Sequence, residues 1–263
     1  MWLEFDSLVN ARDLGGTPTA DGGAIAEGRL IRSDNLQALT TADIVQLRGH
    51  GVSDVVDLRS GPEVRSEGPG PLLSEDDFTV HHLSMFREDP AEPTEPEGEL
   101  PGESSPEAAL PWVGLTPSVD HENLFASHYL SYLRDRPDSV VAALRTIGEA
   151  KGATLVHCAA GKDRTGTITA LALLLAGAEP DAVVADYAAS GERMQQIVDK
   201  LMGTRTYADN LRGRPLSSHM TNPETMAGFI DYIDSEHGGV EPMLESLGWT
   251  DGDTHTLRTK LRA

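Results

Sequence analysis

The chain of 263 residues is poor in cysteine and in lysine, and both shortages restrict its chemistry. Cys158 is the single cysteine, so the chain can form neither an internal disulfide nor a metal site built from several thiolates. Lysine occurs four times, and 42 acidic against 21 basic residues give a net charge of −21. A protein this acidic is repelled by nucleic acid and by anionic membrane surfaces, which excludes both as bulk partners.

Long apolar runs are also missing. The longest, at 168–178, is too short to span a bilayer, and residues 1–9 have neither the basic start nor the apolar core of a secretory signal. We therefore expect no integral membrane segment and a cytoplasmic location, where a free thiol stays reduced. Export by a route without such a signal is the alternative.

Short β-branched runs alternate with helical patterns in the first 160 residues. The runs at 52–58, 78–83 and 153–158 are bounded by glycine or charged residues, which is typical of buried strands. The helical patterns cover 40–51, 122–134, a stretch opening at Pro137, 164–176, 180–188, 192–201, 222–236 and the tail from 250. This order predicts an α/β fold in which a central parallel or mixed sheet is flanked by helices.

One segment departs from this pattern. Residues 87–117 are rich in proline and glutamate and have too few apolar side chains to offset their ordering entropy. We expect a single domain over 1–263 that carries 87–117 as an acidic, proline-rich loop or lid insertion. Trp112 favours a lid that docks on the domain, and an insertion without a role is the alternative.

The sequence HCAAGKDRTG at 157–166 places the cysteine between the last predicted strand and a helix. The backbone N–H groups of a loop at a helix N-terminus form a cradle for a tetrahedral oxyanion. Gly161 lets the backbone turn where a side chain would collide, and Arg164 can hold two phosphate oxygens at once. The predicted phosphate-binding residues are Ala159, Ala160, Gly161, Lys162, Arg164 and Thr165.

The same surroundings favour the thiolate of Cys158, which makes it a nucleophile. We predict that Cys158 attacks phosphorus to give a cysteinyl-phosphate, which water then hydrolyses, while Arg164 stabilises the charge on the equatorial oxygens. Thr165 is expected to donate its hydroxyl to the departing sulfur, and His157 to orient the loop through ring hydrogen bonds. Backbone dipoles and Arg164 supply the positive charge, so we expect no metal and no cofactor.

Five further segments, together with the motif at 157–166, resemble one family, and one of them, HGGVEPMLESLGWT (237–250), is similar in pattern to the closing helices of that family. The segments NARDLGG (10–16), LIRSDNL (30–36), GVSDVVDLRSGPEV (51–64) and VVADYAAS (183–190) are similar to parts of the bacterial cysteine-dependent tyrosine and dual-specificity phosphatases. The resemblance covers most of the chain. It implies the phosphatase α/β fold with extra helices or a lid over the active site, and a phosphorylated protein or a phosphoinositide as substrate.

The resemblance also implies an aspartate that protonates the leaving oxygen. Asp163, inside the cysteine loop, fits this role, although a loop-shaping hydrogen bond or salt bridge is an alternative interpretation. The second position that the resemblance offers is occupied by Arg87, and Asp89 just beyond it is the second candidate. Lys162 adds a cation that the resemblance associates with phosphoinositides and other multiply phosphorylated substrates, and a solvated loop lysine is the alternative.

Other polar and aromatic residues have simpler interpretations. A buried polar scaffold that supports the cysteine loop is expected from the NARD and DLRS segments, and direct contact with the substrate is the alternative. Its members are Arg12, Asp13, Asp57 and Arg59. Tyr129 and Tyr132 lie three residues apart on a predicted helix, a spacing that is typical of a packing stripe.

The predicted function is hydrolysis of phosphotyrosine, with phosphoserine, phosphothreonine and phosphoinositides as further substrates. Two alternatives stay open. An inositol-polyphosphate phosphatase would share the loop but would need a deeper and more basic pocket than four lysines indicate. A catalytically inactive phosphate-binding module would be expected to lack one of Cys158, Arg164 and Thr165, all of which are present.

Overall fold

The computed structural model of the chain describes residues 1–68, 70–88 and 116–263. Within these residues the sheet has five strands in the order β1-β2-β5-β3-β4. Neighbouring strands are parallel, except that β1 pairs antiparallel with β2 at one edge, so the predicted mixed sheet is confirmed. The strands are β1 (Arg12–Asp13), β2 (Leu30–Ser33), β3 (Val52–Asp57), β4 (Thr79–His82) and β5 (Ala153–His157).

β5 is the central strand, and all five of its residues are buried. Helices cover both faces of the sheet, so the strand is an almost continuous apolar run and not an alternating one. Its carboxyl end leads directly into the cysteine loop. Ligands bind at this edge in open α/β sheets, and the fold therefore places the loop where a site is expected.

The helices account for most of the remaining chain. The α-helices are α1 (Thr41–Gly49), α2 (Gly61–Glu67), α3 (Leu124–Asp135), α4 (Pro137–Glu149), α5 (Asp163–Leu175), α6 (Pro180–Ala189), α7 (Met194–Met202), α8 (Arg205–Leu211), α9 (Pro223–His237), α10 (Val240–Glu245) and α11 (Asp251–Arg262). Short 3₁₀ turns are η1 (Pro71–Ser74), η3 (Ser190–Arg193) and η4 (Leu216–His219). Pro137 opens α4 as predicted, and Thr40 caps α1, the helix predicted at 40–51, through reciprocal bonds with Asp43.

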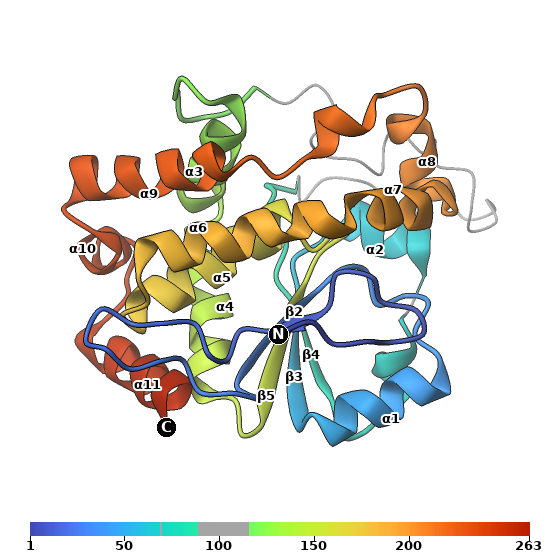
Figure 1. Cartoon of the computed structure of the whole chain (residues 1–263), viewed down its shortest axis with the longest axis horizontal. Coiled ribbons are helices and arrows are strands. Elements are labelled where there is room, and N and C mark those ends of the chain that lie inside the picture. Colours follow the sequence, from blue (N-terminus) through green and yellow to red (C-terminus); the bar gives the residue numbers. More distant parts are fainter. Residues whose placement is uncertain (69, 89–115) are drawn as a thin grey trace.

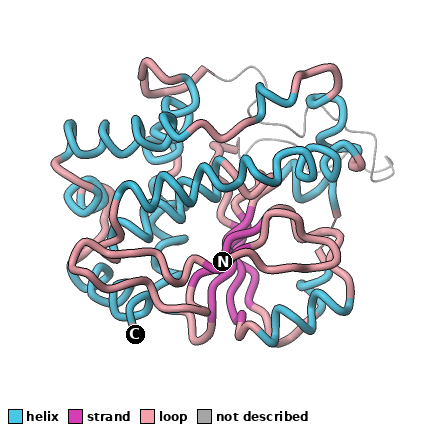
Figure 2. Tube along the Cα trace, viewed as in Figure 1, coloured by secondary structure: helices cyan, strands magenta, loops and turns pink. Residues whose placement is uncertain are grey.

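Two apolar layers lie on the two faces of the sheet, and Figure 2 shows the strands gathered between the helices. Val56 and Val156 pack on one face with α3, α4, α5 and the C-terminal helices. Val55 and Leu155, the preceding residues of the same strands, pack on the other face against Leu47 of α1. The alternation of side chains along each strand thus divides the core into two layers.

Additional helices cover the carboxyl edge of the sheet. α6, η3 and α7 follow one another across the molecule, and α8 lies beyond α7 (Figure 1). Met194, Ile197 and Leu201 of α7 and Tyr207 of α8 form a small apolar cluster with Ala159 of the cysteine loop. The expectation of extra helices over the loop is therefore confirmed.

Several elements differ from the sequence-based predictions. β1, β2, α2 and α8 are not among the predicted elements, because they are short and their composition is unusual for their class. β2, for example, is LIRS, in which Arg32 and Ser33 are fully buried polar residues within a strand. The predicted helix at 192–201 begins as a 3₁₀ turn and becomes α-helical only at Met194. The predicted insertion at 87–117 lies outside the described residues, apart from two positions at each end.

Two further findings concern the described residues only. No helix among them has the length and apolar character needed to cross a bilayer. No group of three or more His, Cys, Asp or Glu side chains in these ranges is arranged to hold a metal ion.

Candidate active site

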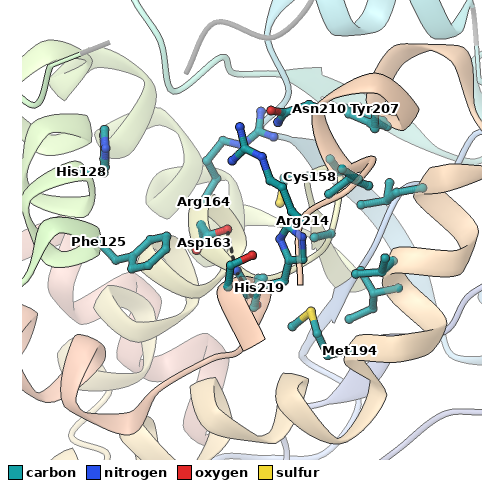
Figure 3. A pocket seen from close by; sticks show the side chains of 18 of the residues that line it. Phe125, His128, Cys158, Asp163, Arg164, Met194, Tyr207, Asn210, Arg214 and His219 are labelled. Carbon is teal, nitrogen blue, oxygen red and sulfur yellow. Dashed lines mark hydrogen bonds and ion pairs between the residues drawn. The ribbon is translucent and has the colours of Figure 1, made fainter. Parts of the chain in front are cut away.

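A pocket of about 360 Å³ opens at the carboxyl end of β5 (Figure 3). The loop from Cys158 to Arg164 forms its floor. Phe125 of α3 lies on one side and Met194 of α7 on the other, and α8 and η4 complete the wall. The sequence motif and the pocket therefore coincide.

Gly161 is the residue that allows the loop to turn. Its φ is +66°, in the left-handed region that side chains disfavour. A Cβ atom at this position would lie 2.4 Å from the backbone oxygen of Ser33 in β2. The glycine is thus required both by its own backbone angle and by the close approach of the loop to the sheet.

The outer side of the loop is held by side chains from distant segments. Asn10 donates from Nδ2 to the carbonyl of Ala160 (2.9 Å), and Arg32 donates from a terminal nitrogen to the carbonyl of Gly161 (2.7 Å). By contrast, no hydrogen bond from the backbone N–H groups of 159–162 is found in the described residues. The carbonyls are occupied and the N–H groups are available, which is the arrangement that an anion cradle requires.

Arg32 belongs to a buried ion cluster behind the loop. Asp186 of α6 accepts from Arg32 (2.5 Å) and from Arg12 (2.7 Å), and Arg12 also donates to Oδ1 of Asn10. Burial and the neighbouring charge of Arg32 lower the pKa of Arg12 to about 10. Arg12 thus occupies the buried scaffold expected for it and reaches the loop through Asn10 and Asp186.

Cys158 lies in the pocket floor with 2 % of its surface exposed. His157 beside it contacts the carbonyl of Cys158 through Nδ1 (3.3 Å) and faces Asp57 across 3.6 Å. Burial lowers the pKa of His157 to about 4, so its ring is neutral at pH 7. Thr165 is close in sequence, but its buried hydroxyl has no hydrogen-bond partner in the described residues, so the expected bond to sulfur is not formed here.

Arg164 is held by a carboxylate that the sequence-based interpretation did not include. Both terminal nitrogens pair with Glu63 of α2 (2.6 and 3.0 Å), and Glu63 is fully buried. Despite the opposing effect of burial, this carboxylate contributes to a pKa for Arg164 well above its usual range. Glu63 also accepts from Tyr207 of α8 (3.0 Å) and from the backbone of Ser60 (2.8 Å). The carboxylate of Glu63 thus links Arg164, which is predicted to bind phosphate, to α8, which covers the pocket.

Asp163, the first residue of α5, lines the pocket and accepts a hydrogen bond from the hydroxyl of Tyr129. A second bond joins Tyr129 to the hydroxyl of Tyr187 (2.8 Å). Tyr129 is packed in the core as expected, with 1 % exposure, and its hydroxyl has a further contact that the spacing does not reveal. Its hydroxyl fixes the position of the Asp163 carboxylate. Asp89, the second candidate for the acid, lies outside the described residues.

Lys162 is not a solvated loop lysine. Its side chain is buried, and Nζ donates to the carbonyl of His219 (2.9 Å) and lies 3.6 Å from the carboxylate of Asp163. The segment that ends in His219 covers the pocket, so Lys162 connects the floor of the pocket to its cover. The alternative of a loop lysine in free solvent is wrong for this structure.

Comparison with known proteins agrees with this geometry. A model of the tyrosine phosphatase family matches residues 3–263. This chain belongs to that family. It is 33 % identical over 206 residues to the triple specificity protein phosphatase PtpB of Mycobacterium tuberculosis, an alignment that covers 74 % of this chain and 71 % of the relative.

Two other relatives align over more of the phosphatase chain. A protein of Cupriavidus necator named as a tyrosine-protein phosphatase is 28 % identical over 248 residues, covering 92 % of this chain and 82 % of the relative. A tyrosine-protein phosphatase of Nostoc commune is 25 % identical over 252 residues, covering 93 % and 78 %. The chain is accordingly a phosphatase, and the resemblance inferred from its motifs is confirmed.

Several residues of this phosphatase site escaped the sequence-based interpretation. Ser60 and Glu63 have the spacing of a capping box, a signal that is visible in the sequence and that the structure contains. That signal does not reveal that the same carboxylate bonds Arg164, which lies 101 residues further along. Arg32 lies in the LIRSDNL segment of the resemblance, but no local pattern indicates what Arg32 or Tyr207 contacts, since each reaches the site only through the folded chain.

Proposed function

We propose that this phosphatase hydrolyses phosphotyrosine through a cysteinyl-phosphate intermediate, with Cys158 as the nucleophile. The observation that carries the proposal is the set of backbone N–H groups at 159–162, which have no partner in the described residues and surround the cysteine at the N-terminus of α5. Arg164, aligned by Glu63, adds the guanidinium that a phosphoryl group needs for charge compensation.

In the proposed first step, Sγ of Cys158 attacks phosphorus and the bond from phosphorus to the leaving oxygen breaks. Asp163, oriented by Tyr129, donates its proton to that oxygen. In the second step Asp163 accepts a proton from water, whose oxygen attacks phosphorus and releases the thiolate. Thr165 would donate its hydroxyl to the departing sulfur. His157 is neutral and buried, and its role in the proposal is to orient the loop.

The pocket wall supports an aryl substrate. Phe125 and Met194 border the pocket from opposite helices, and Ile197 and Leu201 add apolar surface beside the loop. The mycobacterial relative is named for triple specificity, which supports tests of phosphoserine, phosphothreonine and phosphoinositides as well. We further infer that 1–263 acts as one phosphatase domain, and a cytoplasmic location fits the need to keep Cys158 reduced.

The test is hydrolysis of aryl phosphates without added metal by the wild type and by Cys158→Ser. We expect activity that falls at least about 10³-fold in the variant, because the nucleophile is lost. Repeating the assay with a phosphotyrosine peptide and a short-chain phosphoinositide ranks the substrates. An inactive wild type that still binds tungstate would identify a phosphate-binding module. A clear preference for soluble inositol polyphosphates would identify an inositol-polyphosphate phosphatase.

Asp163→Asn separates the acid from a loop-shaping residue. If Asp163 donates the proton, the loss in kcat/KM, which reports only the steps up to the cysteinyl-phosphate, will be much larger for phenyl phosphate than for p-nitrophenyl phosphate, whose leaving group needs no proton. Equal losses with both substrates would show that Asp163 only shapes the loop. Thr167→Ser, on the same helix, is the matched control, because its hydroxyl bonds only the backbone carbonyl of residue 163.

A further inference from the structure

Arg214 lies between α8 and η4 and lines the same pocket as Cys158 and Arg164. In Figure 3 its side chain reaches into the pocket from the covering segment. Arg164 forms a bidentate ion pair with Glu63. The guanidinium of Arg214, by contrast, forms no hydrogen bond or ion pair within residues 1–68, 70–88 and 116–263. An arginine that enters the pocket without an acidic partner there, in a chain with a net charge of −21, is available to bind an anion.

Two further nitrogen-bearing side chains lie on the same wall. Lys162 donates to the backbone of His219, and both residues line the pocket. Nε2 of His219 is buried and has no hydrogen-bond partner in the described residues. Burial and the charges of Lys162 and Arg214 lower the pKa of His219, which shows that both cations act on the same ring. Lys162 and Arg214 therefore supply two cations on this wall, and the ring of His219 between them is kept neutral and can donate or accept a hydrogen bond.

The acid nearest to these side chains offsets only part of their positive charge. The carboxylate of Asp163 lies 3.6 Å from Nζ of Lys162 and forms an ion pair with it, while its other oxygen accepts from Tyr129. Arg214 has no ion pair with Asp163 or with any other described carboxylate. The positive charge on this wall is consequently larger than the reacting phosphate alone would require, since the loop N–H groups and Arg164 already serve that phosphate.

Resting on the proposed function, we propose that Arg214, with Lys162 and His219, binds a second negative charge on the substrate: the carboxylate of an acidic residue next to the phosphotyrosine of a peptide. Phe125 and Met194 on the pocket wall favour a peptide, because they can contact the aryl ring of phosphotyrosine and apolar side chains of the residues next to it. An inositol headgroup presents hydroxyls and phosphates to that wall and gains nothing from it.

Two phosphotyrosine peptides test the proposal, identical except that glutamate flanks the phosphotyrosine in one and glutamine in the other. We expect kcat/KM of the wild type to be about 3- to 10-fold higher for the glutamate peptide, and the ratio to fall to about one in Arg214→Gln. The activity of both enzymes on phenyl phosphate should agree within about twofold. The ratio should also shrink as the salt concentration rises, since the contact is partly exposed.

Arg212→Gln is the matched control, because Arg212 lies on the same segment, carries the same charge and pairs with Asp209 outside the pocket. It should keep the wild-type ratio. A ratio of one in the wild type would overturn the proposal. So would an equal loss on phenyl phosphate and both peptides in Arg214→Gln, which would place Arg214 on the reacting phosphate.

A third result would also overturn the proposal: a preference of the wild type for an inositol bisphosphate over a monophosphate that disappears in Arg214→Gln, without any preference between the peptides. The proposed function can fail separately. If the wild type hydrolyses no phosphotyrosine, the relative affinity of the two peptides for Cys158→Ser, measured by calorimetry, still decides whether the second charge is bound.

Discussion

The two sides of the pocket are built in different ways. The floor is fixed by charged side chains that are almost entirely buried, with Arg32 at 0 % and Glu63 at 0 % exposure. The cover, from α7 to η4, rests on apolar contacts around Tyr207, and much of the segment that contains Arg214 is exposed. The floor holds one geometry because each buried charge has a fixed partner. The cover can vary in sequence at little cost to folding, so substrate selection is expected to reside there.

Two hydrogen bonds join α2 of the floor to α8 of the cover. Tyr207 donates to Glu63, and the hydroxyls of Ser66 and Thr206 lie 2.8 Å apart. The first bond reaches Arg164 through a shared carboxylate, whereas the second anchors the helix without touching that carboxylate. The contrast between floor and cover is therefore testable at residues of either side and at the junction.

The largest effect is expected for Arg32→Met. This change removes one of the two arginines that pair with Asp186 and one donor to Gly161, so the free energy of unfolding should fall by about 3–5 kcal/mol. Arg214→Met on the cover should change it by no more than about 0.5 kcal/mol. Urea titration at pH 7 measures both values. Similar losses in the two variants would contradict the difference between floor and cover.

A smaller effect is expected from pH. His157 has a pKa of about 4 in the folded protein against 6.5 in the unfolded chain. The unfolded chain therefore binds more protons between these values, and the stability that is present above pH 6.5 is lost as the pH falls toward 4, by up to about 3 kcal/mol. His157→Asn should remove this slope from the unfolding free energy between pH 6.5 and 4.

His219→Asn is the counterpart for the cover. The pKa of His219 is lowered in the same direction as that of His157, but its ring is only partly buried. His219→Asn should therefore change the slope of the unfolding free energy against pH much less than His157→Asn does. Both variants should parallel the wild type above pH 6.5. A slope that persists in His157→Asn would assign the acid sensitivity to other groups.

The smallest effect is expected at the junction. Tyr207→Phe removes one hydrogen bond to Glu63, so kcat should fall about 2- to 10-fold while KM stays within about twofold, because Arg164 loses alignment and the pocket wall keeps its shape. Thr206→Val breaks the other bond between α2 and α8 and should leave kcat unchanged. A common loss in both variants would show that α8 needs anchoring in general, and that Tyr207 does not act through Glu63.

Local patterns in the sequence predicted the parts of the site that are local in the chain. The residues from His157 to Thr165 are consecutive, so their chemistry and their place between a strand and a helix follow from the motif. β2 escaped prediction because a strand that buries Arg32 lacks the usual apolar signal. The pairs of Arg32 with Asp186 and of Glu63 with Arg164 join residues more than 100 positions apart. Such contacts arise only when the sheet brings its carboxyl ends together.

The single thiol of this chain lies at the base of the pocket, so a sulfhydryl reagent can label only one place. The fraction of molecules that gain the mass of one alkyl group therefore measures how much of Cys158 is accessible and reduced, without background from other cysteines. Oxidation has the matching consequence: a sulfenic acid at Cys158 finds no second thiol in the chain to form a disulfide with. Its return to the thiol depends on an external reductant, and the oxidation state of the cysteine in a sample is that of Sγ of Cys158 alone.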